Sequence, residues 1–172
     1  MTALAEAAHR RSLLRRALSG LDGIAVLAIL VTSLGMVVIV TVQVFMRYAL
    51  NASLDWAEEV SRLLFVWSVF LAIPLGIKRG SHVSVELVTG WLPAAVQVAL
   101  FRLVSLLCAL LMGVVAWQGA ILAYDQWDEP LTTIDMSVGL FLLPLVIGAA
   151  HSILHLLAGL ADGPPPKRVV SE

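Results

Sequence analysis

Long uncharged apolar runs constrain this chain more than any other feature of its sequence. Residues 23–46, 103–124 and 136–161 contain no Asp, Glu, Lys or Arg. Because a helix rises about 1.5 Å per residue, each run is long enough to cross the ~30 Å hydrocarbon layer of a bilayer. A fourth run, residues 63–77, is about 22 Å long as a helix and spans only if its helix begins in the charged residues before it. The sequence therefore predicts four membrane-spanning helices.

The composition agrees with that prediction. Hydrophobic residues make up 60% of the chain and charged residues 13%, which is far from the composition of soluble globular domains. We therefore expect an all-α integral membrane protein with four transmembrane helices and amphipathic segments at the membrane interface. The expected organisation is a basic arm over residues 1–20, one membrane domain over 21–161 with helices at about 21–46, 55–77, 93–124 and 137–161, and a tail over 162–172.

Most of the positive charge falls on one side of this four-helix topology. The residues concerned precede the first helix, follow the second or lie in the tail: Arg10, Arg11, Arg15, Arg16, Lys78, Arg79, Lys167 and Arg168. Because Lys and Arg are enriched in cytoplasmic loops, we expect both termini to be cytoplasmic and the acidic loops to face outward. The first apolar run is longer than the hydrophobic region of a cleavable signal peptide, so we expect it to remain as a membrane anchor.

A charged amphipathic segment, residues 47–62, separates the first two apolar runs. Between two spans it has to lie at a lipid interface or against a protein partner. Its carboxylates at Asp55, Glu58 and Glu59 are typical of a solvated helix start or of a docking surface. Since no nucleophile, metal-ligand set or activated base accompanies them, we do not expect an enzyme. An aromatic belt is predicted at the same outer interface: Tyr48, Trp56, Tyr124 and Trp127.

The histidines leave a second interpretation open. His151 and His155 are four residues apart on the fourth predicted helix, and His82 lies near the same membrane face. Histidines on facing helices can hold haem in a four-helix membrane bundle, so a haem-binding anchor of an oxidoreductase is one alternative. With no histidine on the first or third helix, we instead interpret them as interface residues and expect no cofactor and no metal. The single cysteine, Cys108, argues against a thiol oxidoreductase, which needs a pair.

The apolar runs also lack what an independent transporter needs. Secondary transporters usually contain repeated halves, broken helices and intramembrane charges that bind and couple their substrates. The chain has no internal repeat, so we do not expect it to transport alone. Gly148 and Ser152, one turn apart on the fourth predicted helix, permit close helix packing. Nothing in the sequence suggests nucleic-acid binding.

Two motifs carry a family resemblance. Residues 47–67, RYALNASLDWAEEVSRLLFVW, and residues 76–86, GIKRGSHVSVE, resemble the small membrane subunit (Q-type, DctQ-like) of tripartite ATP-independent periplasmic (TRAP) transporters. In that family an Arg-Tyr pair ends the first helix, and a Ser-Leu-x-Trp-x-Glu-Glu-x-x-Arg run opens the second. The matching positions, which the resemblance suggests are structural or partner-binding, are Arg47, Tyr48, Asn51, Ser53, Leu54, Trp56, Glu58, Glu59, Arg62, Lys78, Arg79 and His82.

The resemblance implies an accessory subunit of the bacterial inner membrane. In such systems a periplasmic binding protein captures an organic acid, often a carboxylate, and a large permease imports it with sodium. The small subunit binds the large one, and the substrate and sodium sites belong to the large subunit. The expected partners are therefore the large permease, the binding protein and membrane lipids. A second alternative is the small subunit of another tripartite importer, of the tricarboxylate type.

Overall fold

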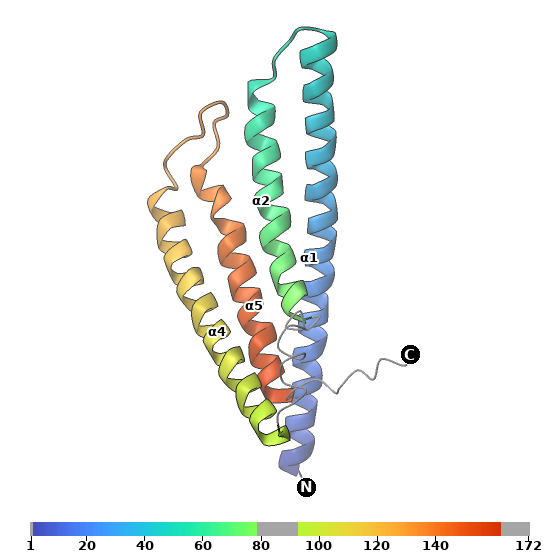
Figure 1. Ribbon diagram of the computed structural model, residues 1–172, viewed down its shortest axis with the longest axis vertical. Coiled ribbons are helices and arrows are strands. Elements are labelled where there is room, and N and C mark those ends of the chain that lie inside the picture. The colour runs from blue at the N-terminus through green and yellow to red at the C-terminus, as the bar shows by residue number, and fades with distance from the viewer. Residues whose placement is uncertain (1, 79–92, 163–172) are drawn as a thin grey trace.

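The structure, a computed structural model, describes residues 2–78 and 93–162 (Figure 1). It contains four long helices, α1 (Thr2–Ala49), α2 (Asp55–Lys78), α4 (Ala94–Asp125) and α5 (Leu143–Asp162), and a short 3-10 helix, η1 (Val138–Phe141). Four helices are long and apolar enough to cross a membrane, and no strand occurs within the described ranges. The predicted fold class, an all-α membrane protein with four spanning helices, is confirmed. Arg79, His82 and most of the predicted tail lie outside the described residues.

Helix α1 is longer than a membrane span. It runs without a break from Thr2 to Ala49 and so includes residues 2–20 of the predicted basic arm. No proline interrupts these residues, and residues 3–17 are rich in Ala, Leu and Arg, which are strong helix formers. At about 1.5 Å per residue the helix is roughly 72 Å long, well over twice the ~30 Å hydrocarbon thickness. In Figure 1 its N-terminal end extends below the other three helices.

The fourth span begins with two helical pieces. Proline fits the first turn of a helix, because the N–H it lacks would have no partner there. Accordingly, Pro144 is the second residue of α5, not a residue in mid-helix, and η1 precedes it. The Ser137 hydroxyl caps η1 by accepting a hydrogen bond of 3.0 Å from the Gly139 N–H.

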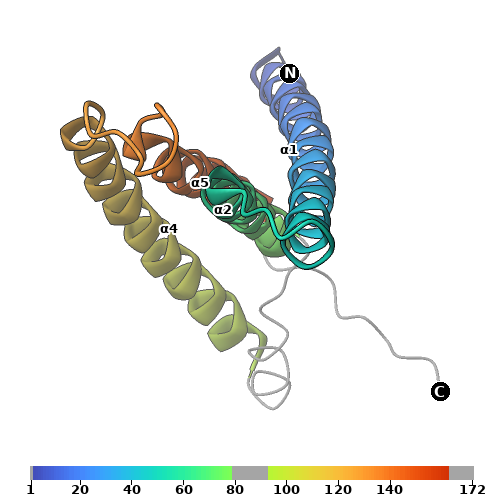
Figure 2. The ribbon, with the colours of Figure 1, turned by 90° about the horizontal axis from the view of Figure 1, so that it is seen from above.

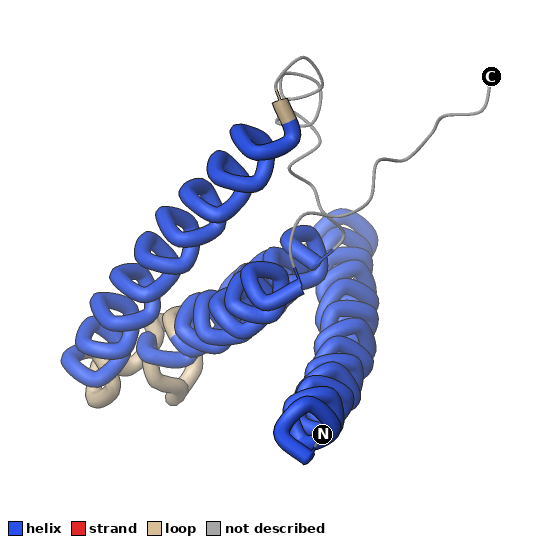
Figure 3. The backbone as a smooth tube through the Cα atoms, turned by 90° about the horizontal axis from the view of Figure 1, so that it is seen from below, coloured by secondary structure: helices blue, strands red, loops and turns tan. Residues whose placement is uncertain are grey.

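The four helices form a row. Helix α1 packs on α2, α2 packs on α5, and α5 packs on α4. The end-on views show α1 and α4 at opposite edges with α2 and α5 between them (Figures 2 and 3). A row buries less side-chain surface than a closed bundle, and the outer helices show it. In the most apolar stretch of α1 and of α4 only 6% of residues are buried, against 33% for the span that contains α5.

The central pair of the row, α2 and α5, makes a backbone contact at Gly148. A β-carbon at this position would collide with the carbonyl oxygen of Phe70. One turn later Ser152 is completely buried, and its hydroxyl donates to the Gly148 carbonyl at 2.7 Å. Small residues let helix backbones approach closely in a membrane, where dispersion and hydrogen bonds replace the hydrophobic effect between helices. The close packing predicted for Gly148 and Ser152 is therefore present.

A glycine-to-alanine pair tests this contact. We expect Gly148→Ala to lower the free energy of unfolding of the purified chain in detergent by about 1–3 kcal/mol. The added methyl group meets backbone atoms, which cannot rotate away as a side chain can. The matched control is Gly113→Ala on α4, where nothing lies within 4 Å of the new β-carbon. Alanine should there be neutral or stabilising by about 0.5–1 kcal/mol. Thermal unfolding followed by circular dichroism measures both variants, and equal stability of the two would contradict the contact.

Candidate functional site

The family-like motif lies where α1 turns into α2, at one end of the long axis of the helices. This end is called the motif end of the row. The turn depends on Asn51, whose φ of 51° lies in the left-handed region. Asparagine tolerates this conformation better than most residues. The Leu50 and Ala52 N–H groups both donate to the Met46 carbonyl, at 3.2 and 3.1 Å, and close the last turn of α1. Asn51 therefore has a structural role in the turn.

Two polar pairs order the start of α2. The Ser53 hydroxyl donates to Oδ1 of Asp55 at 2.8 Å, just where the helix begins. Arg62 Nη2 lies 2.7 Å from Oε1 of Glu58, one helical turn earlier. Both of these side chains are exposed, so the ion pair contributes little to stability. It presents one charge of each sign on the surface.

Glu59 binds a distant loop of the same chain. Its carboxylate accepts hydrogen bonds from the N–H groups of Thr132 and Thr133, both at 3.0 Å, and from the Thr133 hydroxyl at 2.6 Å. Hydrogen bonds to an ionised acceptor are stronger than neutral ones. Glu59 thus holds the loop between α4 and η1 against α2. No sequence pattern predicted this contact, because the partners lie 73 and 74 residues away.

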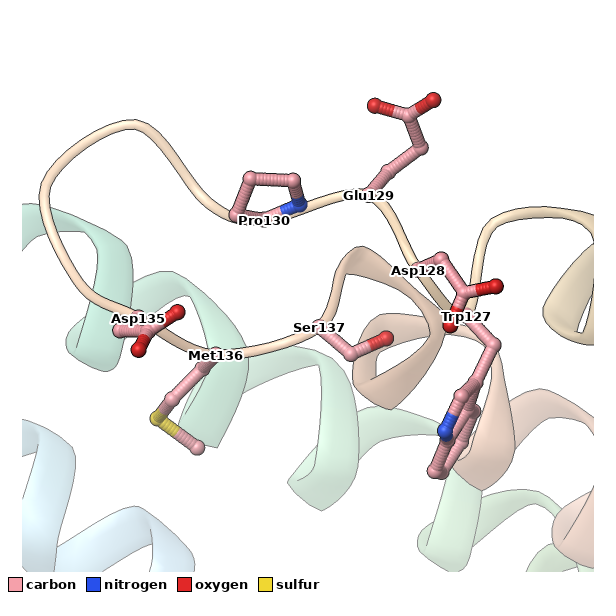
Figure 4. Close-up of a pocket in the computed structure, with 7 residues that line it drawn as sticks. All are labelled: Trp127, Asp128, Glu129, Pro130, Asp135, Met136 and Ser137. Carbon is pink, nitrogen blue, oxygen red and sulfur yellow. The ribbon is translucent and has the colours of Figure 1, made fainter.

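The loop between α4 and η1 folds back on itself. The Val138 N–H donates to the Glu129 carbonyl at 2.9 Å, and the Leu131 N–H donates to the Met136 carbonyl at 2.8 Å. Figure 4 shows a small hollow of this loop, with Trp127 pointing toward the helices and Glu129 pointing away from them. The lining residues are Trp127, Asp128, Glu129, Pro130, Asp135, Met136 and Ser137. Its volume, about 120 Å³, is too small for an organic ligand of drug size.

Exposed aromatic side chains surround this end of the molecule. Tyr48 at the end of α1 and Tyr124 at the end of α4 are 81% and 83% exposed. Trp56 and Trp127 are about half exposed. Arg47, in the last turn of α1, is also exposed. These residues are available to the headgroup region of a membrane or to another protein.

A polar cluster lies at the other end of the helices' long axis, away from the motif. It consists of Asp22 of α1 and of His151 and His155 of α5, and we name it the Asp–His cluster. Oδ1 of Asp22 lies 3.1 Å from Nε2 of His151 and 2.8 Å from Nε2 of His155. The two imidazole Nε2 atoms are 3.1 Å apart. Lys78, the last residue of α2, places Nζ 2.6 Å from the other carboxylate oxygen, Oδ2.

Asp22 is the functional candidate that sequence reasoning missed. It borders the first uncharged run, and its partners are 56, 129 and 133 residues away. The only local signal is the i,i+4 spacing of the two histidines. Both lie on α5 and face the same carboxylate, so the described residues contain no histidine pair on facing helices of the kind that the haem alternative requires. Lys78 keeps its place in the family motif and has a partner within the chain.

Replacing Glu59 should release the loop. In Glu59→Gln the amide has one acceptor oxygen instead of two and no charge, so we expect amide hydrogen exchange at Thr132 and Thr133 to accelerate by roughly tenfold. The matched control is Glu58→Gln, which changes the neighbouring carboxylate that pairs with Arg62. Hydrogen exchange followed by mass spectrometry of the 126–137 peptide reports both variants. Equal exchange in the two would show that Glu59 does not hold the loop.

Comparison with known proteins places the chain in one family. The model of the family described as "Tripartite ATP-independent periplasmic transporters, DctQ component" matches residues 36–163, well over half of the chain. This range includes the turn at Asn51, the start of α2 and both histidines of the Asp–His cluster.

Curated relatives agree with the family match. The isethionate TRAP transporter permease protein DctMQ of Oleidesulfovibrio alaskensis is 29% identical over 74% of this chain and 21% of its own length. The C4-dicarboxylate TRAP transporter small permease protein DctQ of Vibrio cholerae is 29% identical over 52% of this chain and 37% of its own. The sialic acid TRAP transporter small permease protein SiaQ of Vibrio cholerae is 28% identical, over 69% of each. The aligned part is thus about a fifth and just over a third of the first two relatives.

The matched range contains most of the membrane-spanning part, and proteins named as TRAP small permease subunits recur among the relatives. The resemblance noted for residues 47–67 and 76–86 is therefore confirmed. The family consists of transporter subunits, so the chain is not expected to catalyse a reaction of its own. The chain is a multi-pass membrane protein that belongs to the DctQ family, the small membrane subunits of tripartite ATP-independent periplasmic transporters.

Proposed function

We propose that this subunit supports the sodium-coupled import of an organic acid across the bacterial inner membrane, bound to a large permease that receives the substrate from a periplasmic binding protein. The observation that carries the proposal is the open row of helices. Helices α1 and α4 expose long apolar faces, and α1 and α2 present the family motif at their common end. Such a shape fits an accessory subunit that packs beside another membrane protein.

The names of the relatives support a large partner. One relative is a permease protein, DctMQ, of which the matched part is about a fifth. Another is the sialic acid TRAP transporter permease protein SiaT of Haemophilus influenzae, with 10% of its length matched. A segment like this chain therefore occurs inside much longer permease chains. When the two parts are separate chains, we expect them to associate in the membrane.

The same names support the substrate class. Isethionate, C4-dicarboxylates and sialic acid are all small organic anions. We propose that sodium and substrate bind to the large permease, since coupled transport needs intramembrane charges and broken helices. In the described part of this chain the buried carboxylate, Asp22, is already occupied by contacts with Lys78, His151 and His155.

We further propose that the partner binds the outer end of α1 and α2. The exposed groups there are Arg47, Tyr48, Trp56 and the Glu58–Arg62 pair. Glu59 and Asn51 are occupied within the chain, so their part in the motif is to shape this surface. Aromatic and arginine side chains are the commonest energetic anchors of protein interfaces.

Two exposed tyrosines provide a matched test. We expect Tyr48→Ala to reduce the large permease recovered with the tagged chain by roughly five- to tenfold, as for an interface anchor. Tyr124→Ala removes an equally exposed tyrosine at the same end of the row, on α4 and outside the motif, and should leave recovery unchanged. Purification from the native membrane in mild detergent, with quantitative mass spectrometry, gives the ratio. Equal recovery for both variants would contradict the proposed surface, and absence of any permease with the unaltered chain would contradict the function.

The orientation is tested by cysteine labelling. We propose that the motif end faces the periplasm, because the Arg-rich part of α1 lies at the other end. In a Cys108→Ser background, Asp128→Cys in the loop after α4 should react with a membrane-impermeant maleimide in intact cells whose outer membrane has been permeabilised. Ser19→Cys, near the other end of the row, should react only after the inner membrane is broken. The reverse pattern would invert the topology.

A further inference from the structure

We propose that the Asp–His cluster is a binding site for a divalent transition-metal ion, with Zn²⁺ as the expected occupant. The three atoms that meet are Oδ1 of Asp22 and Nε2 of both His151 and His155. Two imidazole nitrogens and one carboxylate oxygen form a ligand set that zinc accepts in proteins, with water in the fourth position. The inference concerns this chain alone and does not depend on its role in transport.

The spacing of the three atoms suits a single ion. They form a nearly regular triangle with sides of 2.8, 3.1 and 3.1 Å. An ion at about 2.1 Å from each, the usual distance for zinc and these ligands, would lie about 1 Å out of the triangle's plane. A tetrahedral site has ligands about 3.4 Å apart, so each atom would move by only a few tenths of an ångström. The side chains already converge as metal ligands do.

The elements that supply the ligands also suit a site. His151 and His155 are one turn apart on the same face of α5, so the helix itself sets their spacing. Asp22 comes from α1, which is not the neighbour of α5 in the row. All three side chains are between 7% and 9% exposed, so water competes little for the ion. An ion there would join the two helices directly.

Lys78 does not occupy the ligand position. Its ammonium group contacts Oδ2, whereas Oδ1 faces the imidazoles, and its side chain is half exposed. A hydrogen-bond donor on the outer oxygen is what orients ligating carboxylates in metal sites. Without an ion, one contact of the triangle is unfavourable in either tautomer. If both Nε2 atoms carry a hydrogen, two donors face each other at 3.1 Å, and if one of them does not, that nitrogen faces the Asp22 oxygen as a second acceptor. An ion would accept the lone pairs of both nitrogens and of the oxygen and so remove that conflict.

The test uses the full-length chain with a tag that contains no histidine, in detergent, after removal of metals with a chelator. Titration with Zn²⁺ should saturate at one ion per chain, and thermal stability should rise with Zn²⁺ and fall again when chelator is added. Co²⁺ bound in place of zinc should give the intense visible absorption of a tetrahedral nitrogen and oxygen site.

A histidine pair provides the matched control. We expect His155→Gln to weaken Zn²⁺ binding by at least about tenfold, since it removes a ligand. His9→Gln is the same chemical change on α1, about 20 Å along the helix from Asp22, and should leave the affinity unchanged. Asp22→Asn keeps the shape of the third ligand and should also weaken binding.

Three results would overturn the proposal. One is the absence of saturable binding by the unaltered chain. Another is the same affinity in His155→Gln as in His9→Gln, which would mean that the ion binds elsewhere. The last is a Co²⁺ complex of the unaltered chain that lacks tetrahedral absorption, a measurement that needs no variant and so does not depend on how the variants fold.

Discussion

The contact between α2 and α5 holds the row of helices together. Helix α1 packs on α2 and α4 packs on α5, so the outer helices are connected through this central pair. The pair meets where Gly148 passes the Phe70 carbonyl, and the Trp67 indole donates to the Leu140 carbonyl at 3.2 Å nearby. In a membrane, lipid competes with protein for every apolar side chain, so close backbone approach and hydrogen bonds decide which helices associate. Because α1 and α4 each pack on only one neighbour, the rest of their apolar surface stays exposed.

Charged groups reinforce the row at its two ends. Glu59 ties the α4–η1 loop to α2 at the motif end, and Asp22 with Lys78 ties α1 to α2 at the other end. Both carboxylates are engaged within the chain, which is how a membrane protein offsets the cost of charge near the hydrocarbon. The surface left for a partner at the motif end is accordingly made of aromatic and arginine side chains and the exposed Glu58–Arg62 pair.

Properties set by neighbouring residues were predictable from the sequence. Uncharged runs predicted the four spans, and Gly148 with Ser152, one turn apart, predicted the close packing of the fourth helix. The contacts of Glu59 and Asp22 were not predictable, because their partners are distant in sequence and two charged residues far apart carry no sign of meeting. The continuity of α1 was not predictable either. The basic arm and the apolar span differ in composition, and this difference suggested two separate segments.

Because α1 has no break, its arm and its membrane-spanning part move as one rigid helix. Its first 20 residues extend the spanning part as one rod, about 30 Å long, and carry four arginines. A change of 10° in the tilt of the span would therefore displace the N-terminal tip by roughly 5 Å relative to the membrane surface. Anionic headgroups that hold those arginines would resist the displacement. Because α1 is one continuous helix, a change in its tilt moves the arginine-bearing end and the motif end in opposite directions, and neither end can be repositioned without the other.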